Sequence, residues 1–156
     1  VAAKVLPKHP EWSWDIYGYG EEFEEIQNLI QIKRLSSQMH LFGQCSNIYE
    51  RYQEYSMLVL TSRYEGFPMA LLEGMGNGLP LVSFDIETGP NEIIQNGRNG
   101  FLVNFDDIET MAERVNELIE NRERRIQMSN ANLEIVPFFE SEHIIQQWIH
   151  LFSMLK

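Results

Sequence analysis

The sequence predicts a doubly wound α/β domain, in which a parallel β-sheet carries helices on both faces. Short apolar segments of strand length alternate along the chain with longer segments whose apolar residues recur at helical spacing. Most strand-like segments end at a turn that contains glycine. The segment 57–60 is continuously apolar, which is typical of a strand buried on both faces. Strands that alternate with helices pair in parallel through right-handed crossovers, so we expect about five strands in one sheet.

The elements follow from these patterns in chain order. Strands are expected at 12–17, 39–42, 57–60, 79–84 and 100–103. Helices are expected at 21–35, 48–55, 68–75 and 107–120, and from residue 141 onwards. The helix 107–120 is amphipathic, with apolar residues at Ile108, Met111, Val115, Leu118 and Ile119. The last helix has an apolar stripe that either docks on this domain or extends towards another part of the protein, formed by Ile144, Trp148, Phe152 and Leu155.

Size and composition limit the functions open to the chain. Its 156 residues make one domain or a fragment, and a hydrophobic content of 44% excludes a disordered chain. The chain begins at Val1, without methionine, in a segment that resembles the middle of a helix, so we interpret it as a piece of a larger protein. The net charge of −11 argues against a nucleic-acid partner. An anionic ligand would have to be held by local dipoles rather than by the overall field.

The remaining composition bears on location and cofactors. The single cysteine, Cys45, cannot form an internal disulfide, which points to a reducing compartment such as the cytoplasm. No signal peptide is visible, and the apolar runs are far shorter than the ~20 residues that span a bilayer. The four histidines lie outside any metal-ligand spacing, and there is no DxD motif, so no metal is expected.

The predicted ligand site lies at the carboxyl ends of the strands, where open α/β sheets bind their ligands. In this chain those ends are the turns 18–20, 43–45, 62–66 and 85–90. Glycine in these turns allows the backbone to approach a ligand closely. For any single turn, the alternative is that a tight turn simply needs glycine.

The segment from Glu65 to Glu73 carries the sharper signal. Pro68 follows a strand and a glycine turn, where it suits the first position of a helix. The free amides of that first turn, with the helix dipole, form an anion site. Glu73 is the only ionisable residue on an otherwise apolar helix, so it should be partly buried and should accept hydrogen bonds, for which ligand hydroxyls are suitable donors. The alternative leaves Glu65 as a solvated turn residue and Glu73 as a cap for neighbouring backbone amides.

An ordered series of motifs resembles the C-terminal, donor-binding domain of family-four retaining glycosyltransferases, which have the GT-B fold. The core of the resemblance is Glu65 and Glu73 with Gly66-Phe67-Pro68, followed by Gly78-Leu79-Pro80-Leu81-Val82. Further matches are 14–20, 41–43, 89–94 and 96–103, in the family's order. The resemblance implies that the fold is Rossmann-like and forms one half of a GT-B enzyme.

The resemblance also implies a role for individual residues. Glu65, the candidate catalytic residue, would contact hydroxyls of the donor sugar, and Glu73 would bind the ribose hydroxyls. Neither carboxylate is required to transfer a proton. The backbone between them would approach the sugar and diphosphate, and the base would rest against the turn after the second strand. The full set of expected donor-binding residues is Gly18, Gly20, Gly43, Gln44, Cys45, Glu65, Gly66, Phe67, Pro68, Met69, Ala70 and Glu73.

The implied activity is transfer of a sugar from a nucleoside-diphosphate sugar to a glycan or lipid-linked acceptor, with retention of configuration and without a cofactor or metal. Uridine is the default base, and the segment 85–92 resembles bacterial members that build surface polysaccharides with hexose or N-acetylhexosamine donors. In the family pattern, an Arg and a Lys clamp the diphosphate from a first strand that would precede Val1. That strand and the N-terminal acceptor domain are absent, so residues 1–156 are expected to bind donor but to show negligible transferase activity alone.

Some alternatives stay open from the sequence. The fold could serve a nucleotide-sugar epimerase, which would need its own His and carboxylate constellation, or a non-catalytic flavodoxin-like module, which would leave the motif series unexplained. The run Arg122-Glu123-Arg124-Arg125 is interpreted as a solvated helix face, with contact to anionic lipid or a lipid-linked acceptor as the alternative. Peripheral association of the full-length protein with the inner face of the membrane also stays open.

Overall fold

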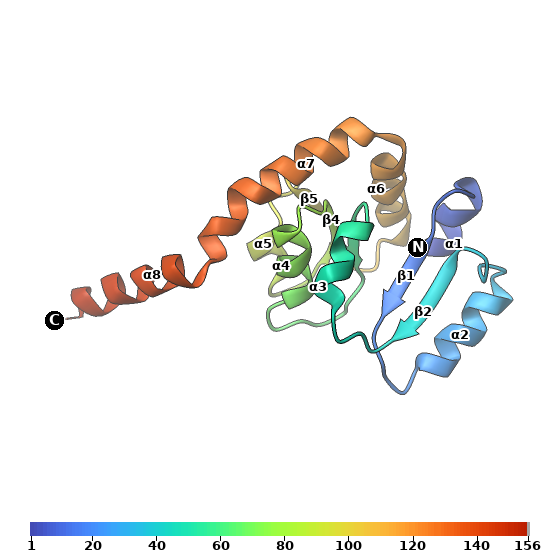
Figure 1. Cartoon of the computed structure of the whole chain (residues 1–156), viewed down its shortest axis with the longest axis horizontal. Coiled ribbons are helices and arrows are strands. Elements are labelled where there is room, and N and C mark those ends of the chain that lie inside the picture. Colours follow the sequence, from blue (N-terminus) through green and yellow to red (C-terminus); the bar gives the residue numbers. More distant parts are fainter. Residues whose placement is uncertain (156) are drawn as a thin grey trace.

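The computed structural model describes residues 1–155, and its five strands are all parallel, as predicted (Figure 1). They form two hydrogen-bonded sheets rather than one. The first sheet pairs β1 (Trp14–Tyr17) with β2 (Met39–Gly43). The second has the order β3 (Leu58–Leu60), β4 (Leu81–Asp85) and β5 (Gly100–Asn104).

Eight α-helices and three short 3₁₀ segments complete the described chain. The α-helices are α1 (Ala2–Val5), α2 (Phe23–Ile32), α3 (Ile48–Arg51), α4 (Met69–Gly76), α5 (Pro90–Ile93), α6 (Ile108–Glu120), α7 (Arg122–Ile135) and α8 (Ser141–Met154). The 3₁₀ segments are η1 (Leu6–Lys8), η2 (Tyr52–Glu54) and η3 (Val136–Phe139). The predicted helices 21–35 and 48–55 are therefore shorter or partly 3₁₀, and α5 and α7 were not predicted as separate elements.

Helices cover both faces of the second sheet because its strands alternate their side chains between two cores. Val82 and Phe84 of β4 point into a cluster that includes Met111, Val115 and Leu118 of α6. Leu81 points to the opposite face, where it packs among the following residues of α4, α5 and α7: Leu71, Met75, Ile93 and Ile135. A third cluster joins α1, η1 and α2 to the first sheet. The predicted architecture of helices on both sides of parallel strands is confirmed.

A cavity of about 1010 Å³ lies between the two sheets. All of β1 and β3 line it, together with residues of α1 and α6. Strands β1 and β3 are consequently only half-buried, and the prediction that the segment 57–60 is buried on both faces is wrong for this structure. The apolar character of β3 is real, but its outer edge faces the cavity instead of a neighbouring strand.

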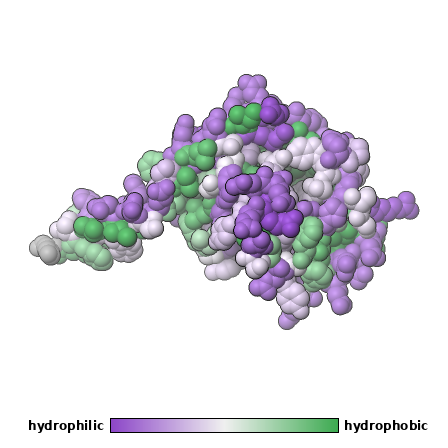
Figure 2. All heavy atoms as spheres, in the orientation of Figure 1, coloured by the Kyte–Doolittle hydropathy of each residue, from purple (hydrophilic) through white to green (hydrophobic). Residues whose placement is uncertain are grey.

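Helix α8 projects away from the body of the molecule, and its predicted apolar stripe is exposed (Figures 1 and 2). Trp148 is 54% exposed and Phe152 58% exposed, and no residue of α8 is buried. Of the two alternatives for this stripe, docking on the rest of the domain is therefore wrong for the described residues. None of the described helices combines the length and the apolar character that a membrane span requires.

Candidate functional site

The turns that follow β1 and β2 are held together at one edge of the first sheet. The amide of Gly18 donates a hydrogen bond to the carbonyl of Gly43 at 2.8 Å. Both glycines have positive φ, 154° and 71° respectively, so both turns use backbone conformations that other residues rarely adopt. Gly20 and Gln44 are exposed and Cys45 is half-buried, which leaves their peptide groups near the surface. The predicted convergence of these two turns is confirmed.

The loop from Glu65 to Ala70 leads from β3 into α4. Pro68 is the N-cap residue and α4 begins at Met69, so the prediction that Pro68 is the first helical residue is off by one position. The carbonyl of Pro68 accepts the amides of Leu71 and Leu72.

The backbone amides ahead of α4 are free, as the predicted anion site requires. Within residues 1–155, the amides of Gly66, Phe67, Met69 and Ala70 donate no hydrogen bond. Gly66, Phe67 and Met69 are exposed and Ala70 is half-buried. A helix N-terminus with free, surface-facing amides attracts an anion through the amide dipoles.

The β4–α5 loop supports this segment from behind. The Thr88 hydroxyl donates to the Glu65 carbonyl at 2.8 Å. Gly89 has a φ of 101°, and a β-carbon added there would lie 2.5 Å from Cδ of Pro68. The turn 85–90 thus meets the turn 62–66, as predicted, and Gly89 allows the closest approach between them.

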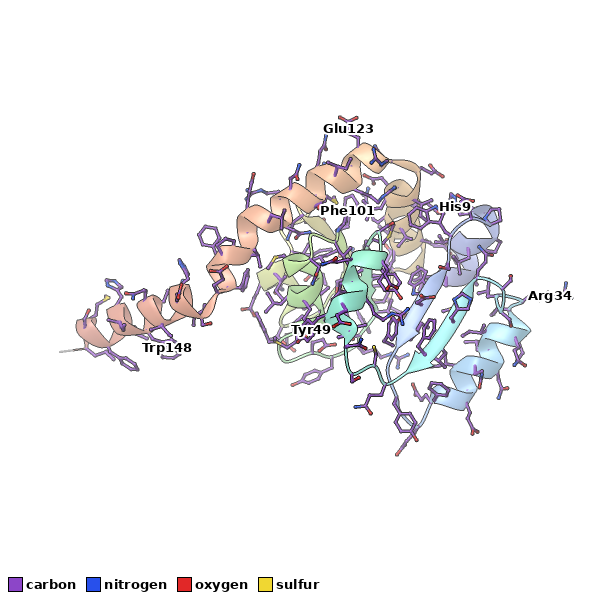
Figure 3. All side chains as sticks on the ribbon, viewed as in Figure 1. His9, Arg34, Tyr49, Phe101, Glu123 and Trp148 are labelled. Carbon is purple, nitrogen blue, oxygen red and sulfur yellow. The ribbon has the colours of Figure 1, made fainter. Side chains whose placement is uncertain are left out.

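The Glu73 carboxylate is half-buried and accepts two hydrogen bonds, which confirms the predicted environment of this side chain. The Tyr49 hydroxyl donates to Oε1 at 2.9 Å, and the Tyr52 hydroxyl donates to Oε2 at 2.8 Å. Tyr49 is exposed on α3, next to α4 (Figure 3), whereas Tyr52 is buried. The donors are therefore side chains of another element, and the alternative in which Glu73 caps backbone amides is wrong.

The sequence prediction missed both tyrosines. The available signal was their spacing of three residues within the predicted helix 48–55, which places two phenols on one helix face. Burial and then the bond to Glu73 raise the pKa of Tyr52, so this phenol keeps its proton and remains a hydrogen-bond donor.

The Glu65 carboxyl group is half-buried and makes no hydrogen bond or ion pair within residues 1–155. Nearby positive charge is scarce, because Arg63 is the only Lys or Arg between residues 52 and 97. Asp85 at the end of β4, Glu87 in the following loop and Glu92 of α5 add negative charge. Within residues 52–97, the free loop amides and Arg63 are therefore the positive features available to an anion. Among the described residues, no group of three or more His, Cys, Asp or Glu is placed to hold a metal ion.

A second polar network fixes the segment that carries the two tyrosines. The Tyr55 hydroxyl donates to Oδ2 of Asp15 at 2.8 Å and lies 2.6 Å from the Tyr17 hydroxyl. Asp15 Oδ1 is 2.8 Å from Nδ1 of His40. These contacts join the end of η2 to β1 and β2, and sequence analysis did not identify them.

The arginine run at the start of α7 is only partly a solvated face. Arg122 and Glu123 are exposed, as predicted. Arg124 and Arg125 turn inward instead, where they donate to the carbonyls of Gly97 and Leu118 and stack over the rings of Phe101 and Trp12. These two guanidinium groups are used to pack α7 onto the domain.

Comparisons with known proteins bear on this arrangement. The family model described as "Glycosyl transferases group 1" matches residues 1–134. The chain is 36% identical over 154 residues to an exopolysaccharide phosphotransferase of Streptomyces coelicolor, covering 98% of this chain and 16% of that protein. It is 30% identical over 154 residues to the poly(ribitol-phosphate) alpha-N-acetylglucosaminyltransferase of Staphylococcus aureus, covering 98% of this chain and 31% of that protein.

A solved structure shows the same fold at high similarity. A point mutant of TarM from S. aureus, solved in complex with Fondaparinux, alpha-GlcNAc-glycerol and UDP, superimposes with a TM-score of 0.89 and 29% identity. The match covers 97% of this chain and 31% of that chain. The chain thus spans less than a third of the length of each of these three relatives.

Proposed function

Because the chain belongs to the glycosyl transferases group 1 family, we propose that it forms the donor-binding part of an enzyme that transfers a sugar from a nucleoside-diphosphate sugar. The observation that carries this proposal is the loop of free amides between Glu65 and Glu73. The flavodoxin-like alternative does not account for family membership, so it is set aside.

In the proposed complex, each part of the donor meets a different part of this edge. The diphosphate lies against the free amides of residues 66–70, and the ribose hydroxyls donate to Glu73. Glu65, which has no partner of its own among the described residues, contacts the hydroxyls of the sugar. The base rests against the peptide groups of Gln44 and Cys45, with Gly18 and Gly20 beside them. UDP in the TarM structure supports a uridine nucleotide as the first ligand to try.

The proposed reaction replaces the bond between the anomeric carbon and the diphosphate with a bond to an acceptor hydroxyl, on the same face of the sugar. The electron pair of the broken bond leaves with the nucleoside diphosphate, and the acceptor proton passes to that phosphate. The dipoles at the start of α4 stabilise the charge that develops on the leaving group. No step in this scheme uses a metal or another cofactor.

We also propose that the domain is completed by a strand and a second domain from elsewhere in the polypeptide. One strand added between β1 and β3 gives an order of six strands in which the added strand comes first in the chain, which is the usual order 3-2-1-4-5-6 of a doubly wound sheet. The cavity lined by both edge strands is the space that it would fill. A second domain, carrying the acceptor site, would then face the carboxyl ends of the strands, where the free amides lie. The acceptor, a glycan or lipid-linked molecule, is bound there.

The direct test is to titrate the chain with UDP, GDP and ADP and to compare wild type with Glu73→Ala. We expect weak binding of at least one nucleotide and a loss of more than about tenfold in the variant, because two hydrogen bonds to a charged group are removed. Glu65→Ala should keep the affinity for the nucleotide but lose the extra affinity for the matching nucleotide sugar. If no nucleoside diphosphate binds, the proposal is wrong.

The Streptomyces relative gives a second candidate, transfer of a sugar phosphate instead of a sugar. The two reactions break different bonds of the donor, so they release different nucleotides as products. Sugar transfer by the full-length protein releases a nucleoside diphosphate, whereas sugar-phosphate transfer releases a nucleoside monophosphate. Chromatography of the released nucleotide separates the candidates, and we expect the diphosphate. The 156-residue chain alone should release neither above background.

A further inference from the structure

The two oxygens of the Glu73 carboxylate are each bound by a tyrosine from a single short segment. Tyr49 of α3 donates to Oε1 and Tyr52 of η2 donates to Oε2, at 2.9 and 2.8 Å. A lone hydrogen bond would leave a carboxylate free to rotate about its last side-chain torsion. Two bonds to different oxygens fix both the position of the group and the orientation of its plane.

These bonds leave room for a ligand. An ionised carboxylate has about four lone-pair sites, and the two phenols use two of them. One site on each oxygen therefore stays available, which matches the two neighbouring hydroxyls of a ribose. A carboxylate whose plane is already set loses less conformational entropy when such a diol binds.

The two tyrosines differ in how firmly they are held. Tyr52 is 6% exposed, whereas Tyr49 is 59% exposed. The rings contact each other edge to face, with centroids 6.4 Å apart. A buried phenol has no water to replace its bond to Glu73, but the exposed hydroxyl of Tyr49 can exchange its partner for solvent. The contribution of Tyr52 should therefore be the larger.

The segment that carries both tyrosines is itself anchored. Tyr55, directly after η2, donates to Asp15 and pairs with Tyr17 of β1. The guanidinium of Arg51 lies 5.6 Å from the ring centroids of Tyr17 and of Phe42. The tyrosines thus connect the sheet that holds the Gln44–Cys45 turn to the helix that holds Glu73.

We propose that Tyr52, assisted by Tyr49, is a positioning residue that presets Glu73 to accept the two ribose hydroxyls of the donor, and thereby makes the site selective for ribonucleotides over 2′-deoxyribonucleotides. This inference rests on the proposed function, because it needs Glu73 to bind ribose. It assigns a role to Tyr49 and Tyr52, and a selectivity between ribo- and deoxyribonucleotides, that neither the family match nor the motif series assigns.

The test compares UDP with 2′-deoxy-UDP on wild type, Tyr52→Phe, Tyr49→Phe and Glu73→Gln by calorimetric or NMR titration. Wild type should favour UDP by about tenfold, the equivalent of one hydrogen bond to a charged group. Tyr52→Phe should reduce this preference to about two- to threefold, with a smaller reduction for Tyr49→Phe. Gln53→Ala is the matched control, because it changes an exposed side chain of the same segment that makes no hydrogen bond within residues 1–155. Its ratio should match wild type.

The ratio of the affinities for UDP and 2′-deoxy-UDP distinguishes a positioning effect from a loss of folding. A partly unfolded protein binds both nucleotides less well and leaves this ratio unchanged. Circular dichroism and the Tm of each variant report folding independently. If Glu73→Gln removes the preference but Tyr52→Phe keeps it, Glu73 binds ribose without help and the positioning proposal is wrong. If wild type binds UDP but shows no preference, Glu73 does not read the ribose diol. If no nucleoside diphosphate binds at all, the proposed function fails together with this inference.

Discussion

At the scale of single residues, Gly89 shows how one backbone position can determine the shape of the site. Its φ of 101° is strained for any side chain, and a β-carbon there would lie 2.5 Å from Cδ of Pro68. The bond from the Thr88 hydroxyl to the Glu65 carbonyl depends on the same close approach. The site loop is therefore held by a contact that tolerates no added atom.

We predict that Gly89→Ala separates the two loops and weakens both stability and nucleotide binding. Relieving the clash requires Pro68 to shift, and Pro68 lies in the middle of the loop that presents the free amides. The loss in stability should be about 1–3 kcal/mol, the range for a strained backbone position. Urea unfolding and UDP titration would measure the two effects. Gly76→Ala is the control, because a β-carbon at Gly76 would come no closer than 3.9 Å to Val136. Equal effects at both glycines would contradict the argument.

The environment of Glu73 could be predicted from the sequence, but its hydrogen-bond partners could not. Glu73 was predicted to be partly buried and hydrogen-bonded because it is the one ionisable group on an apolar helix, and the structure agrees. Its partners could not be predicted, because Tyr49 and Tyr52 are 24 and 21 residues away in the chain. Only the tertiary fold brings the hydroxyls of α3 and η2 to α4. The ligand roles of Glu65, Glu73 and the turn residues remain predictions.

At the scale of elements, periodic segments were predicted best. The helix 107–120 has a regular apolar stripe, and α6 covers residues 108–120 with Met111, Val115 and Leu118 of that stripe in the core. Helix α7 was missed because its sequence is dominated by polar residues and its buried positions include Asn132 as well as Met128 and Ile135. Asn132 donates to the carbonyl of Leu79 at 2.7 Å, a tertiary contact that no local periodicity reveals.

The N-terminus of α6 offers a test of local helix signals. Asp107 is its N-cap, accepting the Thr110 amide at 3.0 Å through Oδ1 and the Thr110 hydroxyl at 2.7 Å through Oδ2. The bonds to the backbone and side chain of Thr110 lower the pKa of Asp107 below its ordinary value of 3.8. A carboxylate with a lowered folded-state pKa stabilises the protein above its unfolded pKa, and this stabilisation is lost as pH falls through the folded-state pKa.

We predict that Asp107→Ala lowers the Tm at pH 7 and that the difference from wild type shrinks as pH falls below about 4. Asp107→Asn should retain most of the stability, because Asn is also a good N-cap, but it should lose the pH-dependent part. Thermal unfolding of the three proteins between about pH 7 and about pH 3 measures this. A difference between wild type and Asp107→Ala that is constant over this range would show that the cap charge contributes nothing.

At the scale of the whole molecule, the main departure from the sequence prediction is the division of the sheet. Each half was predicted correctly, because hydrophobic strands and crossover helices specify parallel pairing locally. Strands β1 and β3 do not pair with each other, and their facing edges border a cavity of about 1010 Å³. The strand order and this cavity are the two observations that support the proposed additional strand between β1 and β3.

The proposed strand predicts a gain in stability and a specific change in backbone protection. A longer protein that includes the native residues ahead of Val1 should be more stable than the 156-residue chain by several kcal/mol, because a buried strand fully buries apolar side chains that contribute about 1.5–3 kcal/mol each. Hydrogen exchange should slow at amides on the facing edges of β1 and β3, which gain partners only when a strand lies between them. A Gly/Ser extension of equal length is the control, because it has no apolar side chains to fill the cavity, and it should leave these amides unprotected. If the native extension protects other parts of the chain but not β1 and β3, the cavity is not a strand site. Protection of both strands would show that the new strand lies between them. Its carboxyl end would then lie beside Glu65 and the free amides, since parallel strands end on the same side of a sheet.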